Sequence, residues 1–126
     1  MKGNLSVKRL PFNFFAMELI NDICRLKAFV AGNKLSLLYI QAPDCGLCSI
    51  MFDKINAVVE RFEHLKSARA ELHVVPEVAG EFLVATAPTV LLFFQGKEVY
   101  RAGTFIDVTS LDRVLANWNE HFNCLS

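Results

Sequence analysis

The stretch that decides the fold is residues 35–48, which read LSLLYIQAPDCGLC. Residues 35–40 form an apolar run of strand length, and such a run predicts a strand that is covered on both faces. Residues 42–44 (Ala-Pro-Asp) break this strand. A helix is predicted from Gly46 to about Leu65 because apolar side chains recur there on one stripe, at Met51, Ile55, Val58, Val59 and Phe62. Cys45 and Cys48 therefore stand where a buried strand gives way to a helix.

The chain before and after this stretch alternates helices with short strands. Helical spacing of apolar residues predicts a first helix over about residues 15–31, and Gly32-Asn33 ends it because both residues tolerate positive φ. Further strands are predicted at 71–75, 89–95 and 98–102, with a short helix at 76–82. The segments 35–41, 46–65 and 71–75 then form a right-handed βαβ unit. The fold class is α/β, with a mixed central sheet of about four to five strands and helices on both faces.

Two local signals complete this outline. Gly96-Lys97 predicts a two-residue hairpin loop of type II′, with glycine at its first position. The last helix runs from about Thr109 to Phe122, and either Thr109 or Ser110 is its expected N-cap.

Length and composition exclude several classes of protein. The 126 residues suit one domain, 1–126, with enough core to fold without disulfide staples. Acids and bases number 13 each, so the chain lacks the positive charge of a dedicated nucleic-acid binder. Residues 8–17 only partly match a signal peptide, and no apolar run is long enough to cross a membrane. We expect a cytoplasmic protein with no nucleic-acid or membrane partner.

Cys45-Gly46-Leu47-Cys48 is the motif that carries chemistry. At the start of a helix the backbone N–H groups lack intrahelical partners and the dipole is positive, so a thiolate is favoured over a thiol at Cys45. Cys48 follows one turn later, close enough to form a disulfide and more shielded by backbone, while Gly46 keeps the space near the sulfur open. We expect Cys45 to attack and Cys48 to resolve.

A metal site is the first alternative. A zinc site needs two further ligands at compatible spacing, but there is no second Cys-x-x-Cys and the histidines at 64, 73 and 121 are scattered. Ligand count favours a redox pair and no metal, although two chains could share zinc or an iron–sulfur cluster through Cys45 and Cys48. The remaining cysteines have no such context: Cys24 is expected to be a small buried hydrophobe and Cys124 an exposed thiol.

The sequence resembles the thioredoxin family at several places in the right order. Residues 42–48 look like its active-site loop, 87–90 (Ala-Pro-Thr-Val) like its cis-proline loop, 95–99 like its hairpin, and Ala102-Gly103 like the glycine near its substrate groove. The resemblance implies a thioredoxin-like fold, a cis Ala87–Pro88 bond and peptide substrates bound along the Ala87 backbone. A trans proline opening a strand is the other interpretation of Pro88. The implied substrate contacts are Asp44, Gly46, Leu47, Ala87, Pro88 and Gly103.

The same resemblance implies a thiol–disulfide oxidoreductase. Its partners would be proteins that contain disulfides and an external reductant such as a thioredoxin reductase. It would need no cofactor beyond its own redox-active disulfide, Cys45–Cys48.

The chain departs from the family pattern at four positions. Asp44 replaces a tryptophan, and its carboxylate either opposes the Cys45 thiolate or caps the helix, which we favour. Leu47 replaces a proline, Asp53 stands where a helix-kinking proline is common, and Tyr39 takes the position of a buried acid, where we expect a core residue. The changes at Asp44 and Tyr39 motivate a second hypothesis, a non-catalytic thioredoxin-like module that binds a partner.

Overall fold

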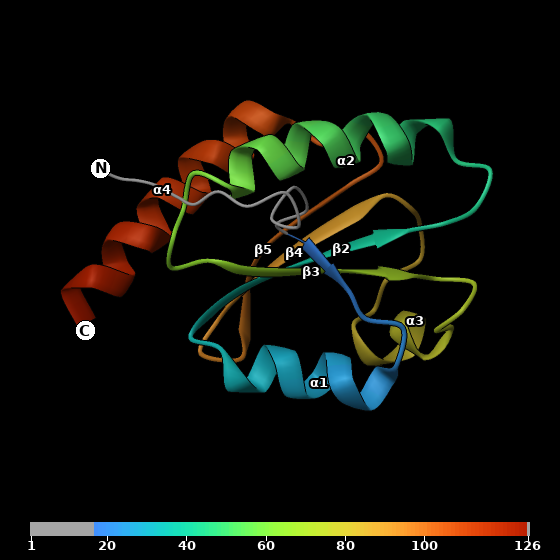
Figure 1. The fold of residues 1–126 in the computed structure, drawn as a ribbon, viewed down its shortest axis with the longest axis horizontal. Coiled ribbons are helices and arrows are strands. Elements are labelled where there is room, and N and C mark those ends of the chain that lie inside the picture. Colours follow the sequence, from blue (N-terminus) through green and yellow to red (C-terminus); the bar gives the residue numbers. More distant parts are fainter. Residues whose placement is uncertain (1–16, 126) are drawn as a thin grey trace.

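Five strands form one mixed sheet at the centre of the molecule (Figure 1). The structure, a computed structural model, describes residues 17–125, with side chains described for 17–122. The spatial order is β1-β3-β2-β4-β5. The strand bounds are β1 Met17–Leu19, β2 Leu35–Gln41, β3 Lys66–Glu71, β4 Thr89–Phe94 and β5 Lys97–Gly103. β3 pairs in parallel with β1 and β2, whereas β4 is antiparallel to both β2 and β5, so the predicted mixed sheet is confirmed.

Helices cover both faces of the sheet, as predicted (Figure 1). One face carries α2 (Gly46–Val59) and α4 (Val108–Leu125), and the other carries α1 (Ile23–Gly32) and α3 (Glu77–Glu81). The side chains between these layers form two separate clusters of buried residues, one on each face. Within the described range, no helix is long and apolar enough to span a bilayer.

Strand β2 lies in the middle of the sheet and is covered on both faces, as its apolar run predicts. Leu37 and Tyr39 belong to the cluster under α2 and α4, whereas Leu38 and Ile40 belong to the cluster on the α1 face. All four side chains have no exposed surface. Burial of both faces fixes the register of β2, because a slip by one residue would exchange the two sets. The fixed register of β2 also fixes where this strand ends and where the connection to α2 starts.

The first predicted helix is wrong in its N-terminal part. Residues 17–19 form a strand, β1, at the edge of β3, and α1 begins only at Ile23. The physical reason is the cap: the Asp22 carboxylate accepts a hydrogen bond from the Cys24 N–H at 3.0 Å, which starts the helix there. The helix ends at Gly32 as expected, but Asn33 is extended, with φ of −121°, and does not adopt positive φ.

The predicted position of the third strand is also wrong. Helix α2 ends at Val59, well before Leu65, and β3 occupies 66–71 where the sequence predicted 71–75. The sequence of β3, KSARAE, lacks the β-branched residues that favour strands, but its small alanines, Ala68 and Ala70, are fully buried against neighbours. Val74 and Val75 instead lie in a turn, where both N–H groups donate to the Glu71 carbonyl.

Two further local predictions need correction. The hairpin loop is Gln95-Gly96, with φ of 52° and 81° and with Phe94 paired to Lys97, so the turn has positive φ at both central positions as in type I′. At the last helix, the cap is neither Thr109 nor Ser110. Asp107 accepts hydrogen bonds from the Thr109 N–H and the Ser110 hydroxyl, so α4 begins one residue earlier, at Val108. The predicted short helix is present as α3, directly after Pro76.

Candidate active site

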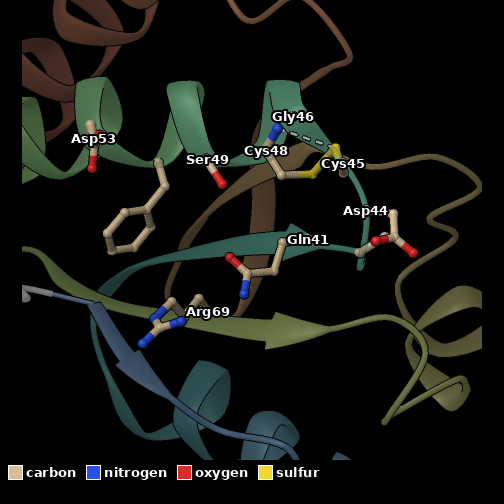
Figure 2. Close-up of a pocket in the computed structure, with 10 residues that line it drawn as sticks. Gln41, Asp44, Cys45, Gly46, Cys48, Ser49, Asp53 and Arg69 are labelled. Carbon is tan, nitrogen blue, oxygen red and sulfur yellow. Dashed lines mark hydrogen bonds between the residues drawn. A yellow bond between two sulfur atoms is a disulfide. The ribbon is translucent and has the colours of Figure 1, made fainter.

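A disulfide joins Cys45 and Cys48 at the point where β2 passes into α2, with Cα atoms 5.2 Å apart (Figure 2). Cys45 is the N-cap of α2, with extended backbone, and its Sγ accepts a hydrogen bond from the Cys48 N–H at 3.1 Å. Cys48 is buried, with 4% of its surface exposed, whereas Cys45 is half-buried. The prediction that Cys48 is the less accessible thiol is confirmed.

The position of the Cys45 sulfur determines its chemistry. A sulfur that caps a helix is aimed at N–H groups without intrahelical partners and at the positive end of the helix dipole. After reduction, both features stabilise negative charge on the sulfur, so the thiolate form of Cys45 is favoured.

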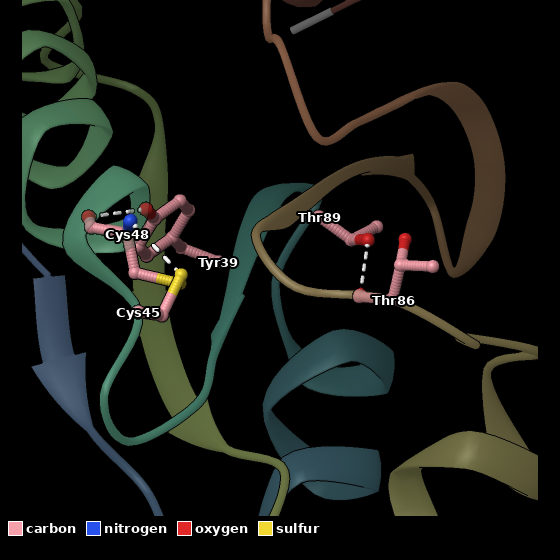
Figure 3. The surroundings of a disulfide bond; sticks show 5 residues. All are labelled: Tyr39, Cys45, Cys48, Thr86 and Thr89. Atoms are coloured by element: carbon pink, nitrogen blue, oxygen red, sulfur yellow. Dashed lines mark hydrogen bonds between the residues drawn. A yellow bond between two sulfur atoms is a disulfide. The ribbon is translucent and has the colours of Figure 1, made fainter.

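Tyr39 of β2 lies next to the disulfide and ties the first turn of α2 to the sheet (Figure 3). Its hydroxyl donates a hydrogen bond of 2.6 Å to the Cys48 carbonyl, and its ring packs against Phe52 with centroids 6.2 Å apart. Burial raises the pKa of Tyr39 above its ordinary range, so the side chain is neutral at physiological pH. The prediction of a core residue is confirmed, and the structure adds a hydrogen bond that the sequence did not reveal. Tyr39 brings no negative charge to Cys48.

Asp44 does not cap the helix, which corrects our expectation. It precedes the cap, has a φ of 54° in the left-handed region, and is exposed. Aspartate adopts this conformation more readily than most residues, which explains how the chain turns here without glycine. The side chain that caps the start of α2 is therefore that of Cys45.

The loop with Ala87 and Pro88 lies at the same edge of the sheet as the disulfide. Ile40 near the end of β2 pairs with Thr89 at the start of β4, which brings the preceding loop beside the one that carries Cys45 (Figure 3). The Ala87–Pro88 peptide bond is cis. The Thr89 hydroxyl donates to the Thr86 carbonyl at 2.7 Å and so closes this loop on itself.

Gly103, at the end of β5, lies next to this loop. It is the ladder partner of Thr89, and the following N–H, of Thr104, donates to the Pro88 carbonyl at 2.8 Å. A Cβ at Gly103 would come within 3.4 Å of the Thr89 hydroxyl oxygen, so the backbones approach closely there. The structure thus brings Ala87, Pro88 and Gly103 together at the edge that carries the dithiol.

A pocket of about 540 Å³ lies on the other side of the disulfide, over β2 and β3 (Figure 2). Its polar lining comes from Gln41, Asp44, Ser49, Asp53 and Arg69, together with both cysteines. Arg69 is the β3 partner of Tyr39, and its guanidinium carbon lies 5.2 Å from the centre of the Phe52 ring.

Sequence reasoning did not find Arg69 or Gln41. With the strand placed at 71–75, Arg69 falls in a loop, so nothing directs attention to it. The available signal is the alternation in β3: Ser67 and Arg69 face the α2 side, whereas Ala68 and Ala70 pack on the α1 face. A charged residue in the middle of a strand next to the buried β2 is unusual and marks a special environment.

The other candidate residues lie away from the disulfide. Cys24 is exposed and free, which contradicts the expected burial, because α1 turns Leu26 and Val30 toward the core and Cys24 outward. His64 stacks on Phe122, and His121 packs against Trp118. Within residues 17–122, no three His, Cys, Asp or Glu side chains are grouped so as to hold a metal. The Cys124 side chain lies outside the described residues, as do the phenylalanines at 12, 14 and 15, which the sequence predicts to pack over the sheet rather than to form an exposed patch for a partner.

This fold, with a dithiol at the start of α2 and a cis-proline loop beside it, defines a thioredoxin-like protein. The family model for thioredoxin matches residues 24–117. The chain is 30% identical over 96 residues to thioredoxin-like protein YdfQ of Bacillus subtilis, covering 76% of this chain and 86% of that protein. The chain belongs to the thioredoxin family.

Solved structures agree with this assignment. Thioredoxin NaTrxh from Nicotiana alata superposes with a TM-score of 0.74 at 25% identity, covering 87% of this chain and 96% of that one. Oxidised mitochondrial thioredoxin 3 from Saccharomyces cerevisiae, at 16% identity, has the same fold with a TM-score of 0.73, covering 83% and 98%. Family membership and the Cys45–Cys48 pair together support a general thiol–disulfide oxidoreductase role.

Replacement of the buried tyrosine tests its tie to the active-site helix. Tyr39→Phe removes the bond to the Cys48 carbonyl and is expected to lower the free energy of unfolding of the oxidised protein by about 1 kcal/mol. The raised pKa keeps the folded hydroxyl protonated while an unfolded tyrosine ionises near 10.0. The stability advantage of the wild type is therefore full below pH 10 and shrinks as the pH rises above it.

Urea unfolding of wild type and variant across this pH range measures both effects. Tyr100→Phe is the matched control, since Tyr100 is half-buried in β5 and lies outside the pocket beside the disulfide. An unchanged stability of Tyr39→Phe at neutral pH would show that the hydrogen bond contributes nothing.

The two cysteines near helix starts provide an internal comparison of reactivity. Cys24 lies in the first turn of α1, but there the Asp22 carboxylate caps the helix and accepts the Cys24 N–H, which puts negative charge beside the thiol. In α2 the Cys45 sulfur is itself the cap. We predict that, in the reduced protein at neutral pH, iodoacetamide modifies Cys45 about tenfold faster than Cys24 or more.

Mass spectrometry of the two cysteine peptides after short reaction times measures these rates. Cys24 is the more exposed thiol, so accessibility alone predicts the reverse order. Equal rates, or a faster Cys24, would contradict activation of Cys45 by the helix start.

Proposed function

We propose that this protein is a thiol–disulfide oxidoreductase that reduces or exchanges protein disulfides through Cys45 and Cys48. The observation that carries the proposal is the unequal environment of the two sulfurs. Cys45 is half-buried and caps α2, whereas Cys48 is buried one turn further on. One sulfur is therefore placed to meet a substrate, and the other is placed to meet only its partner.

The reaction proceeds by two thiol–disulfide exchanges. The Cys45 thiolate attacks one sulfur of a substrate disulfide, a mixed disulfide forms, and the other substrate sulfur leaves as a thiolate. The Cys48 thiolate then attacks the Cys45 sulfur and releases the remaining substrate sulfur. The substrate gains two electrons and the Cys45–Cys48 disulfide forms. An external reductant, such as a thioredoxin reductase, restores the dithiol, so no bound cofactor or metal is required.

Substrate chains would lie along the loop beside the disulfide. The Ala87 backbone precedes the cis peptide bond, and Gly103 approaches from β5 without a side chain. On the helix side, Gly46 adds no bulk and Leu47 presents an apolar, half-buried side chain. Asp44 is exposed beside this surface, whereas Pro88 is buried. An extended peptide held by main-chain contacts fits this surface.

The proposal includes the setting in which the protein works. Cys24 is an exposed free thiol, and such a residue suits a reducing compartment, here the cytoplasm. The balanced charge suits contacts with many protein disulfides and gives no support to a nucleic-acid partner. A membrane partner is not part of the proposal.

A second candidate function is a module that binds a partner while its cysteines turn over slowly. The neutral Tyr39 under Cys48 favours this candidate, because it supplies no carboxylate to accept the Cys48 proton. Asp44, next to the attacking sulfur, acts in the same direction, since a neighbouring negative charge opposes a thiolate.

Reduction of insulin disulfides by dithiothreitol distinguishes the two candidates. The wild type is expected to speed the reduction, and Cys45→Ser is expected to fall to the rate of dithiothreitol alone because the attacking thiolate is lost. Cys24→Ser removes a thiol that the mechanism does not use and should keep the wild-type rate. If wild type and Cys45→Ser are equally slow with dithiothreitol and with a thioredoxin reductase system, the binding module is the better description.

A further inference from the structure

The disulfide has two different sides. The cis-proline loop leads into β4 and Gly103 ends β5, whereas the pocket of about 540 Å³ lies over β2 and β3. Because β2 separates β3 from β4 in the sheet, a ligand in the pocket and a peptide on the cis-proline loop would approach the disulfide from opposite sides. The peptide surface is formed mostly by backbone and apolar groups, whereas the lining of the pocket includes the charged side chains of Asp44, Asp53 and Arg69.

The charges in the pocket do not neutralise each other. Among the described residues, Arg69 has no carboxylate within ion-pair distance, and its Nε atom is enclosed without a hydrogen-bond partner. The Phe52 ring lies beneath the guanidinium and shields it from water on that side. A half-buried guanidinium without a counter-charge is costly, and a carboxylate is the group that best satisfies it, through two parallel hydrogen bonds.

The carboxylate of Asp53, on the opposite wall of the pocket, complements the positive charge of Arg69. Figure 2 shows Asp53 on α2 and Arg69 on β3 across the same end of the pocket, with Asp44 at the loop end. Asp53 forms no ion pair with any residue that the structure describes. At this end of the pocket, one positive and one negative group therefore face the same space, while the second carboxylate, Asp44, lies at the loop end. A zwitterion matches this arrangement.

We propose that this pocket is a binding site for low-molecular-weight disulfides that carry an α-amino-acid group, such as cystine. The inference rests on the proposed function and names a second substrate class for the same dithiol. Arg69 binds the α-carboxylate, Asp53 binds the ammonium group, and the Gln41 amide lies between Arg69 and the disulfide (Figure 2). The volume lies in the range of about 300–1,000 Å³ that small-molecule sites occupy.

The chemistry requires no group beyond the dithiol. The Cys45 thiolate attacks one sulfur of cystine, and one cysteine leaves as a thiolate. Cys48 then attacks the Cys45 sulfur and releases the second cysteine. One cystine becomes two cysteines, and the two electrons come from the dithiol, which becomes the Cys45–Cys48 disulfide.

The test compares four small disulfides that differ only in their charged groups. They are cystine, 3,3′-dithiodipropionic acid with carboxylates alone, cystamine with amines alone, and neutral bis(2-hydroxyethyl) disulfide. The protein is reduced, freed of reductant and mixed with each probe. Acid-quenched samples are alkylated, and mass spectrometry of the Cys45–Cys48 peptide gives a single-turnover rate. Each rate is divided by that for the neutral probe, which corrects for changes in thiol reactivity.

The variants assign each charge to its ligand group. Arg69→Gln is expected to lower the relative rates of cystine and dithiodipropionic acid by about tenfold, because it removes a charge-assisted hydrogen bond to their carboxylates. The relative rate of cystamine, which has no carboxylate, should stay unchanged. Arg69→Lys should restore much of the loss, because it keeps the charge. Asp53→Asn is expected to slow cystine and cystamine and to spare dithiodipropionic acid. The matched control is Lys54→Gln, which removes an exposed charge on α2 that does not line the pocket, and its ratios should not change.

Several results would overturn the proposal. Equal rates for all four probes in the wild type, or an equal slowing of all four undivided rates in Arg69→Gln, would show that Arg69 has only a structural role. If insulin is reduced with Cys45 dependence while cystine shows no dependence on Arg69, the small-disulfide site fails and the oxidoreductase proposal stands. If neither insulin nor any probe reacts through Cys45, the oxidoreductase proposal fails as well.

Discussion

The hydrogen bond from the Cys48 N–H to the Cys45 sulfur is the interaction on which the rest of the site depends. It makes a cysteine the N-cap of α2, so one sulfur lies outside the helix and the other inside its first turn. The burial of β2 on both faces fixes its register, and the loop 42–44 leads from its end to the cap. Tyr39 then holds the turn from below through the Cys48 carbonyl. Unequal exposure of two sulfurs, and hence the order of their reactions, follows from these backbone constraints.

The surroundings of this disulfide separate into two surfaces of different chemistry. On one side, the cis Ala87–Pro88 bond and Gly103 present backbone at close range, which suits an extended chain of almost any sequence. On the other side, Arg69 and Asp53 carry charges that no described residue pairs. Tyr39 stands at the position where the family pattern has a buried acid, and this change bears on the unpaired charge of Arg69. Tyr39 is the ladder partner of Arg69, and without a carboxylate at that position the guanidinium is available to a ligand.

Sequence reasoning succeeds where a local pattern has one physical solution, and it fails where tertiary contacts decide. The apolar run at 35–40 leaves no alternative to a buried strand, and the place of Cys45, in the short connection after that strand, follows from it. By contrast, β3 has the sequence KSARAE, and only its contacts with β1 and β2 make it a strand. The misplacement of β3 hides Arg69, the residue with the most informative environment. The cap of α2 shows the same limit: Asp44 has the better capping side chain, but its φ of 54° leaves that role to Cys45.

Trapping of the mixed disulfide tests the central claim, that Cys45 attacks and Cys48 resolves. Reduced Cys48→Ser and Cys45→Ser proteins are each mixed with a peptide that contains one disulfide, and mass spectrometry locates the adduct. The unequal burial of the two sulfurs predicts that Cys48→Ser accumulates a stable adduct on Cys45. It also predicts that Cys45→Ser forms almost none on Cys48. Adducts that form on Cys48 as fast as on Cys45 would contradict the account.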